Sequence, residues 1–160
     1  MPYLQKVETK EEHILHHLMQ FYIYEFSKYI PVIQVEENGA YKPFDLEKYW
    51  EQSQNHAYFI KEDTELIGFA LVESATESGP NTIEEFFIMA KHSGRGYGKI
   101  IAQELFSMFP GDWEITQIEK NQPAHAFWSG LIKDITDGNF IEHFEEGKYI
   151  QTFHTKSILR

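Results

Sequence analysis

The sequence contains no cysteine, few basic residues and no long apolar run. Without cysteine, disulfides, thiolate metal sites and a cysteine nucleophile are excluded. The 14 lysines and arginines stand against 25 acidic residues, for a formal net charge of −11. A general nucleic-acid binder needs a basic surface to replace counterions on phosphates, so the charge argues against this class. No run approaches the roughly 18 apolar residues of a membrane span, and the N-terminus lacks a signal-peptide core. We therefore expect a cytoplasmic protein without nucleic-acid or membrane partners.

The composition that is present suits an ordinary folded domain. The chain has 160 residues, of which 42% are hydrophobic and 16% aromatic, enough to bury a core. We expect one domain over residues 1–160. Its acidic surface favours a cationic or amine substrate through electrostatic steering.

The apolar periodicity predicts the element order β-α-α-β-β-β-α-β-α-β-β. Apolar residues at three- and four-residue steps predict a helix over 11–30 that Pro31 ends. Strands are expected at residues 3–8, 57–60, 66–72, 82–90, 113–118, 140–144 and 149–153. Three further helices are expected: one over 45–53, one from the glycines at 94–98 to about 109, and one that begins at Asn121. We expect an α+β fold with a mixed central sheet of about seven strands flanked by about four helices.

The most informative segment is an apolar strand that runs into three alternating glycines and then a helix. Gly94, Gly96 and Gly98 occupy this junction. Glycine allows positive φ and a close approach of the backbone to a ligand. The first N–H groups of the following helix are unpaired, and with the helix dipole they attract an anion. The segment predicts a phosphate-binding loop, although a plain strand-to-helix turn is the alternative.

Two known glycine motifs do not fit this loop. The dinucleotide motif G-x-G-x-x-G would need glycine where Lys99 or Ile101 stands. The phosphate loop of NTPases needs Ser or Thr after Gly98-Lys99, and Ile100 has no hydroxyl for magnesium.

A third pattern does fit. The run Ser93-Gly94-Arg95-Gly96-Tyr97-Gly98 after an apolar strand resembles motif A of the GNAT N-acetyltransferase superfamily, with Ser93 in place of the usual Arg or Gln. A second stretch, Asn121-Gln122-Pro123-Ala124-His125-Ala126-Phe127-Trp128, resembles that family's Asn-x-x-Ala-x-x-Phe-Tyr on the next helix. The two matches cover roughly residues 56–130 and occur in the order that the family shows. The resemblance therefore implies a single-domain GNAT-like fold.

The resemblance also implies the ligands and their contacts. Acetyl-CoA would be the acyl donor, a small-molecule or peptide amine the acceptor, and no metal would be required. The pyrophosphate would bind the loop, and the pantetheine arm would pair with the preceding strand like an added strand. The implied cofactor-binding residues are Ile88, Met89, Ala90, Ser93, Gly94, Arg95, Gly96, Tyr97, Gly98, Lys99 and Asn121. A homodimer is one expected form of assembly, and the resemblance does not name the acceptor.

Glu84 is the candidate general base, because some family members place a catalytic glutamate four residues before the position of Ile88. Side chains alternate along a strand, so Glu84 shares one face with Ile88 while Glu85 shares the other with Phe87. Glu85 is the alternative if the register differs by one residue. The family's usual general acid is a tyrosine where this chain has Trp128, and Tyr149 is considered as a substitute.

Simpler interpretations accompany these assignments. Asn121 could be a plain helix N-cap. The spacing of His13, His16 and His17 suits one helix face, but no metal motif such as H-E-x-x-H accompanies it.

As a whole, the chain is either an N-acetyltransferase or, in the alternative interpretation, an acyl-CoA-binding sensor or partner-binding module without catalysis. A third interpretation is a structural interaction protein.

Overall fold

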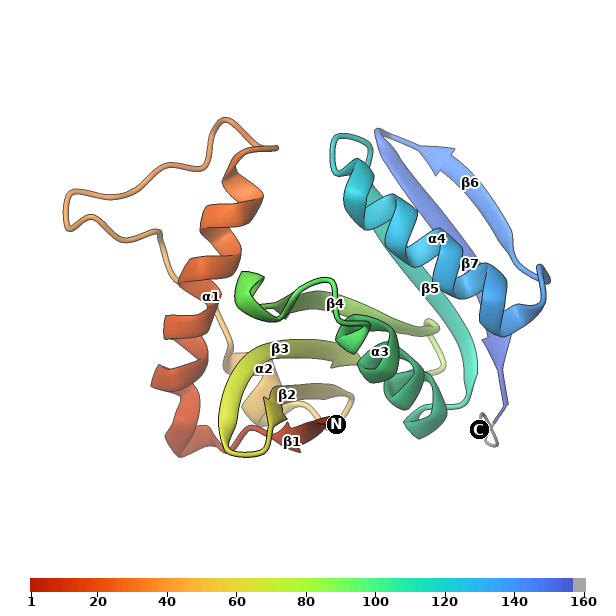
Figure 1. Cartoon of the computed structure of the whole chain (residues 1–160), viewed down its shortest axis with the longest axis horizontal. Helices are drawn as coiled ribbons and strands as arrows, with labels where there is room; N and C mark the ends of the chain where they lie inside the picture. Colours follow the sequence, from red (N-terminus) through yellow and green to blue (C-terminus); the bar gives the residue numbers. More distant parts are fainter. Residues whose placement is uncertain (157–160) are drawn as a thin grey trace. The chain divides into compact units, whose positions relative to one another are not determined.

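The computed structural model describes residues 1–156 and divides the chain into two compact units. The first unit comprises Met1–Leu71 and Glu85–Tyr97, and the second comprises Val72–Glu84 and the chain from Gly98 onward. The strands are β1 (Pro2–Lys6), β2 (Asn55–Glu62), β3 (Glu65–Glu73), β4 (Asn81–Ile88), β5 (Gly111–Ile118), β6 (Ile141–Glu145) and β7 (Lys148–Thr155). The α-helices are α1 (Glu12–Ser27), α2 (Glu47–Glu51), α3 (Tyr97–Met108) and α4 (Gln122–Thr136) (Figure 1). Short 3₁₀ turns occupy Thr9–Glu11 and Ala90–His92.

The strands follow the order β1-β2-β3-β4-β5-β7-β6 in a seven-stranded sheet. β1 pairs antiparallel with β2, and β7 pairs antiparallel with both β5 and β6. β4 and β5 are parallel, and their ladder consists of Asn81 opposite Trp113 and Thr82 opposite Glu114. The predicted mixed α+β fold, its element order and its seven strands and four helices are confirmed.

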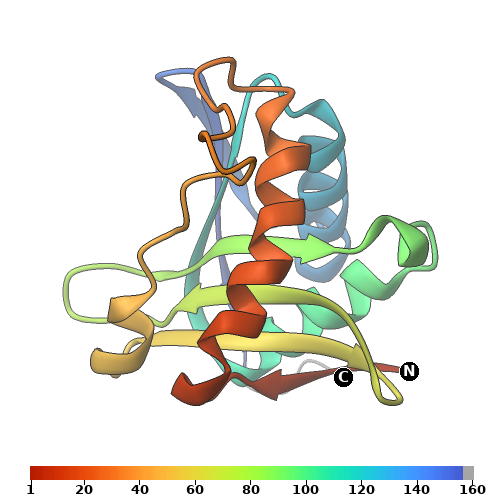
Figure 2. The same ribbon diagram turned by 90° about the vertical axis from the view of Figure 1, so that its left-hand side faces the viewer.

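The first unit is built on helix α1, which crosses the face of the neighbouring strands (Figure 2). The predicted apolar stripe is the face that packs, since Leu15, Leu18, Met19 and Ile23 are buried. Leu15, Leu18 and Met19 join a core with residues of β2 and β3, including Phe59 and Phe69. Phe87 of β4 and Met89, the first residue after this strand, pack against the same core. The α1-facing side of β4 is therefore the side that carries Phe87.

The second unit is held together by an aromatic cluster. The ring of Phe106 on α3 lies 4.8 Å from Trp113 on β5, 5.3 Å from Phe153 on β7 and 6.4 Å from Trp128 on α4. Helix α4 runs along β5 and β7 (Figure 1). The β6–β7 hairpin turns at Glu146 and Gly147, whose φ values of 50° and 78° are those of a tight primed turn. The predicted hairpin over residues 140–153 is confirmed.

Some boundaries differ from the sequence-based expectation. Helix α1 ends at Ser27, before Pro31, because the N–H groups of Tyr29 and Ile30 bond to carbonyls three residues back and tighten the chain into turns. The second helix begins at Glu47 rather than at Asp45, and its N-cap is Leu46. The Asp45 carboxylate still accepts a hydrogen bond from the N–H of Glu47 at 3.0 Å. That helix ends at Glu51, two residues earlier than the expected Ser53. No helix within residues 1–156 has both the length and the apolarity that a membrane crossing requires.

Candidate functional site

The C-terminal half of β4 is more exposed than its place inside the sheet suggests. Every residue from Glu84 to Met89 is only half-buried, whereas residues 67–72 of β3 are fully buried. The N–H of Met89 donates to the carbonyl of Ile67 at 2.8 Å. Because backbone groups alternate between the two edges of a strand, Ile88 directs its own to the edge opposite Ile67. Ala90 already lies in the 3₁₀ turn, and its carbonyl accepts a hydrogen bond from the N–H of Ser93 at 3.1 Å. An arm that adds to β4 would therefore use the backbone of Ile88, since the N–H of Met89 is already bonded.

The loop after β4 has the geometry of an anion-binding turn. A 3₁₀ turn over Ala90–His92 precedes it, and Gly94 and Gly96 have φ values of 78° and 79°. A Cβ placed on either glycine would meet no heavy atom within 4 Å, so open space lies in front of both. Among the described backbone bonds of the turns and loops, the N–H of Ser93 donates to Ala90 at 3.1 Å, and no N–H of residues 94–96 donates. The N–H groups of residues 94–96 therefore precede the 12-residue helix α3 as donors that suit a phosphate group.

Two acidic residues of the β2–β3 hairpin fasten this loop. Tyr97, the first residue of α3, donates its hydroxyl to the Glu62 carboxylate. This hydrogen bond raises the pKa of Tyr97, while Arg95 acts in the opposite direction. The Glu65 carboxylate lies 3.0 Å from Nζ of Lys91 and 3.0 Å from Nε2 of the buried His92. The hydrogen bond from Lys91 and then that from His92 hold the pKa of Glu65 below its usual value.

The lowered pKa of Glu65 leads to a testable pH dependence. Such a group stabilises the folded loop above its unfolded pKa, and the contribution is lost as pH falls through the folded value. We expect the amide NMR signals of Gly94 and Gly96 to shift with a midpoint below about 4.3, the ordinary glutamate value. A Glu65→Gln variant should lack this transition. A transition that persists unchanged in the variant would exclude Glu65 as its source.

The remaining loop candidates begin helix α3. Gly98 lies in the first turn of this helix and is helical, so it does not share the conformation of the other two glycines. Lys99 lies 4.0 Å from the Asp134 carboxylate. Arg95 is exposed, as are Ser93 and the two glycines beside it.

Asn121 is confirmed as the N-cap of α4 in the second unit. Its side-chain oxygen accepts a hydrogen bond from the N–H of Ala124 at 3.2 Å, and Pro123 lies in the first turn. This is the cap geometry expected from the sequence. Its contact with a cofactor stays a prediction.

The two glutamates of β4 have different environments. The Glu85 carboxylate accepts a hydrogen bond of 2.5 Å from the hydroxyl of Tyr22 on α1. Glu85 therefore shares the α1-facing side with Phe87, as the alternation predicts. Glu84, the predicted base, takes the other side. The sequence offers no signal for the Tyr22–Glu85 contact, because the two residues lie 63 positions apart.

Trp128, which replaces the family's tyrosine and cannot serve as a general acid, and Tyr149, the candidate substitute, both lie in the second unit. Trp128 is 7% exposed and packs edge-on against Phe127 at 4.9 Å, so it belongs to the core. The ring of Tyr149 stacks on His125 at 3.8 Å, and Nε2 of Gln122 lies 3.4 Å from its hydroxyl. A role of Tyr149 as an acid stays a prediction. Within residues 1–156, no group of three metal-ligating side chains is arranged to hold an ion, and this includes the three histidines of α1.

Solved structures share this architecture. An acetyltransferase from Thermus thermophilus is 18% identical to this chain, with a TM-score of 0.66. The match covers 96% of this chain and 97% of the Thermus thermophilus chain. A spermidine N-acetyltransferase chimera with a Vibrio cholerae component is 12% identical, with coverages of 96% and 95% and a TM-score of 0.63. A Bacillus anthracis protein solved with acetyl coenzyme A is 11% identical, with coverages of 98% and 98% and a TM-score of 0.58. At these identities the likeness establishes the fold.

The sequence profile of the acetyltransferase (GNAT) family matches residues 14–131, and the chain belongs to this family. No curated protein sequence matches the chain significantly.

Proposed function

We propose that the protein transfers an acetyl group from acetyl-CoA to a primary amine. The observation that carries the proposal is the loop Gly94–Gly96, whose N–H groups make no backbone bond among the described loop bonds and whose glycines face open space. These donors would hold the diphosphate of the cofactor, with Arg95 beside them. Membership of the acetyltransferase family supports the donor, as does the acetyl coenzyme A bound in the Bacillus anthracis neighbour. The spermidine N-acetyltransferase neighbour supports an amine acceptor by its name.

The reaction requires little of the protein beyond placement and proton removal. The acetyl donor supplies an activated thioester. The amine nitrogen forms a bond to the acetyl carbon, the carbon–sulfur bond breaks, and CoA leaves as a thiolate. The amine must be neutral to attack, so a general base accepts its proton, directly or through water. A backbone N–H at the C-terminal end of β4 would stabilise the charge on the carbonyl oxygen.

Glu84 is the proposed general base. A Glu84→Gln variant should lose turnover by about 100-fold or more, the usual contribution of general base catalysis, because the amide cannot accept the proton. Its affinity for acetyl-CoA should stay that of the wild type. Steady-state kinetics and calorimetry measure the two quantities. If Glu84→Gln turns over normally while Glu85→Gln does not, the base is Glu85.

The function itself is tested by following free thiol during incubation with acetyl-CoA and a panel of polyamines, aminoglycosides, amino acids and peptides. Acceptor-dependent thiol release is the expected result. Tight acetyl-CoA binding without release across the panel would instead identify a sensor. That alternative has one observation in its favour, since the buried indole of Trp128 supplies no hydroxyl. Failure to bind any CoA would contradict both interpretations.

A further inference from the structure

We propose that Tyr97 and Glu62 are positioning residues, whose hydrogen bond holds the loop of residues 93–96 in the conformation that binds a diphosphate. The proposal rests on the diphosphate binding proposed above and names the side chains that give the loop its shape. All residues that carry it belong to the first unit.

The loop of residues 93–96 is held at both ends. The ring of His92, which precedes the loop, lies 6.4 Å from the ring of Tyr97, which follows it, and the two ring planes are inclined by only 23°. Nε2 of the buried His92 lies 3.0 Å from the Glu65 carboxylate, and the Tyr97 hydroxyl donates to the Glu62 carboxylate. The two ends of the loop therefore contact each other, and each is fastened to the β2–β3 hairpin.

The part of the hairpin that carries Glu62 is itself held by β1. Pro2 lies opposite Glu62 in the ladder between β1 and β2. The hydroxyl of Tyr3 donates to the carbonyl of Asp63 at 2.6 Å, and Asp63 has the φ of 54° that a tight turn requires. A side chain anchored on a paired strand supports a site more precisely than one on a loop. Tyr97 is therefore tied to the sheet.

The loop has few bonds of its own between these two ends. The hydroxyl of Ser93 donates to the carbonyl of Ala90 at 2.9 Å, and no N–H of residues 94–96 donates among the described backbone bonds of the turns and loops. A Cβ on Gly94 or Gly96 would meet no atom within 4 Å, so packing does little to restrict either residue. Glycine has the greatest backbone freedom of all residues. The direction of the N–H donors therefore depends on the residues that hold the loop ends.

The charge of Glu62 gives the proposal an expected sign that simple electrostatics does not share. A carboxylate beside an anion site repels the anion, so charge alone predicts that removal of Glu62 strengthens diphosphate binding. A positioning role predicts the opposite, because a loop without its anchor must be ordered by the ligand at a cost in binding free energy. The hydrogen bond to Glu62 also raises the pKa of Tyr97, so the Tyr97 hydroxyl keeps its proton and acts as the donor.

Binding of CoA and of inorganic pyrophosphate tests the role without turnover. Tyr97→Phe removes only the hydroxyl and Glu62→Ala removes the acceptor, and each should weaken the binding of both ligands about tenfold, or about 1.4 kcal/mol. Glu62→Gln keeps an oxygen that accepts a hydrogen bond and should bind with an affinity between those of Glu62→Ala and the wild type. The double variant should bind no more weakly than the weaker single variant, because both substitutions break the same bond. Calorimetry measures CoA, and NMR titration measures pyrophosphate.

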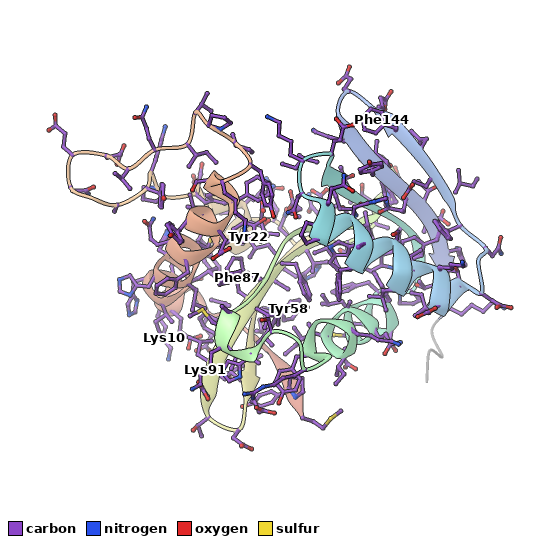
Figure 3. All side chains as sticks on the ribbon, turned by 45° about the horizontal axis from the view of Figure 1, so that its top comes forward. Lys10, Tyr22, Tyr58, Phe87, Lys91 and Phe144 are labelled. Atoms are coloured by element: carbon purple, nitrogen blue, oxygen red, sulfur yellow. The ribbon has the colours of Figure 1, made fainter. Side chains whose placement is uncertain are left out.

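The amide signals of Gly94 and Gly96 provide a readout that a general loss of stability would not give. In ligand-free Tyr97→Phe these signals should shift or broaden. Saturating pyrophosphate should return them to the positions of the wild-type complex, because the bound ligand then imposes the same loop conformation. Tyr58→Phe is the matched control, since it removes a hydroxyl from β2, the strand that carries Glu62, and should keep the wild-type signals and affinities (Figure 3).

Each outcome decides a separate point. Wild-type affinity in Tyr97→Phe, or tighter binding in Glu62→Ala or Glu62→Gln, overturns the positioning role. Additive losses in the double variant overturn the pairing of the two residues. If Glu62→Ala does not fold, Tyr97→Phe and Glu62→Gln must still both bind more weakly than the wild type. If the affinities follow the expected order but no amine in the panel releases thiol, the positioning role stands and the proposed acetyl transfer fails.

Discussion

A Gly96→Asp variant should lose about 100-fold or more of its affinity for acetyl-CoA. Gly96 has a φ of 79° in the loop that precedes α3, and a Cβ there would extend into open space. Asp tolerates this left-handed conformation better than most residues, so the loop should keep its shape. Its carboxylate, however, would lie where the diphosphate is proposed to bind. Two like charges about 4 Å apart repel by about 4 kcal/mol at an effective dielectric constant of 20. Since about 1.4 kcal/mol corresponds to tenfold in affinity, a 100-fold loss is a conservative figure.

Two control variants separate charge from shape. Gly96→Asn adds nearly the same volume without the charge, and it should retain most of the affinity that Gly96→Asp loses. Gly147→Asp places the same side chain on a glycine of similar φ, 78°, with equally open surroundings, in the turn between β6 and β7. It should bind acetyl-CoA like the wild type. Calorimetric affinities that are equal for Gly96→Asp and the wild type would mean that the anion binds elsewhere.

The second large effect is expected on stability, from Gly68→Ala on β3. A Cβ on Gly68 would lie 2.0 Å from the carbonyl oxygen of Phe87 and 3.2 Å from the Cα of Ile88. Both are backbone atoms, so no side-chain rotation can relieve the clash, and β4 must move. Overpacking of this kind costs typically about 1–3 kcal/mol and more when backbone shifts, and we expect about 3 kcal/mol here. The movement would also displace the Ile88–Ala90 segment, so the affinity for acetyl-CoA should fall with the stability.

The matched control for this variant is Gly130→Ala. Gly130 is exposed on α4, and a Cβ there meets no atom within 4 Å. In a helix, Ala is more favourable than Gly by about 1 kcal/mol, so the same substitution should raise the free energy of unfolding. Urea denaturation measures both variants. If Gly68→Ala is as stable as the wild type, the close approach of β3 and β4 does not exist as described.

Much of the fold could be predicted because its signals are local. The apolar stripe of α1, the cap of α4 by Asn121 and the turn of the β6–β7 hairpin each depend on residues within a few positions of one another. The glycine loop is predictable for the same reason, since the strand, glycines and helix are contiguous. Local signals fail at the 3₁₀ turn over Ala90–His92, where a hydrogen bond from the N–H of His92 to Met89 bends a chain whose apolar pattern predicts a strand as far as Ala90.

The family resemblance extends the prediction to acetyl-CoA and to Glu84 as the candidate base, but it does not settle which face of β4 each glutamate takes. Glu84 is favoured by its distance from Ile88 along the strand. Which face each glutamate takes depends on what packs above β4, and alternation alone leaves this open. The contact from Tyr22 gives Glu85 the α1-facing side.

By itself, the sequence determined the class of fold, the glycine turn between β4 and α3 and the exclusion of cysteine chemistry, because composition and short-range pattern are sufficient for each of these. Tertiary structure alone decided which distant side chains meet. Tyr22 reaches Glu85 across 63 positions, and Tyr97 reaches Glu62 across 35. Such pairs depend on how strands align and how a helix rotates on its sheet. These are properties of the packed core as a whole, and no short stretch of sequence encodes them.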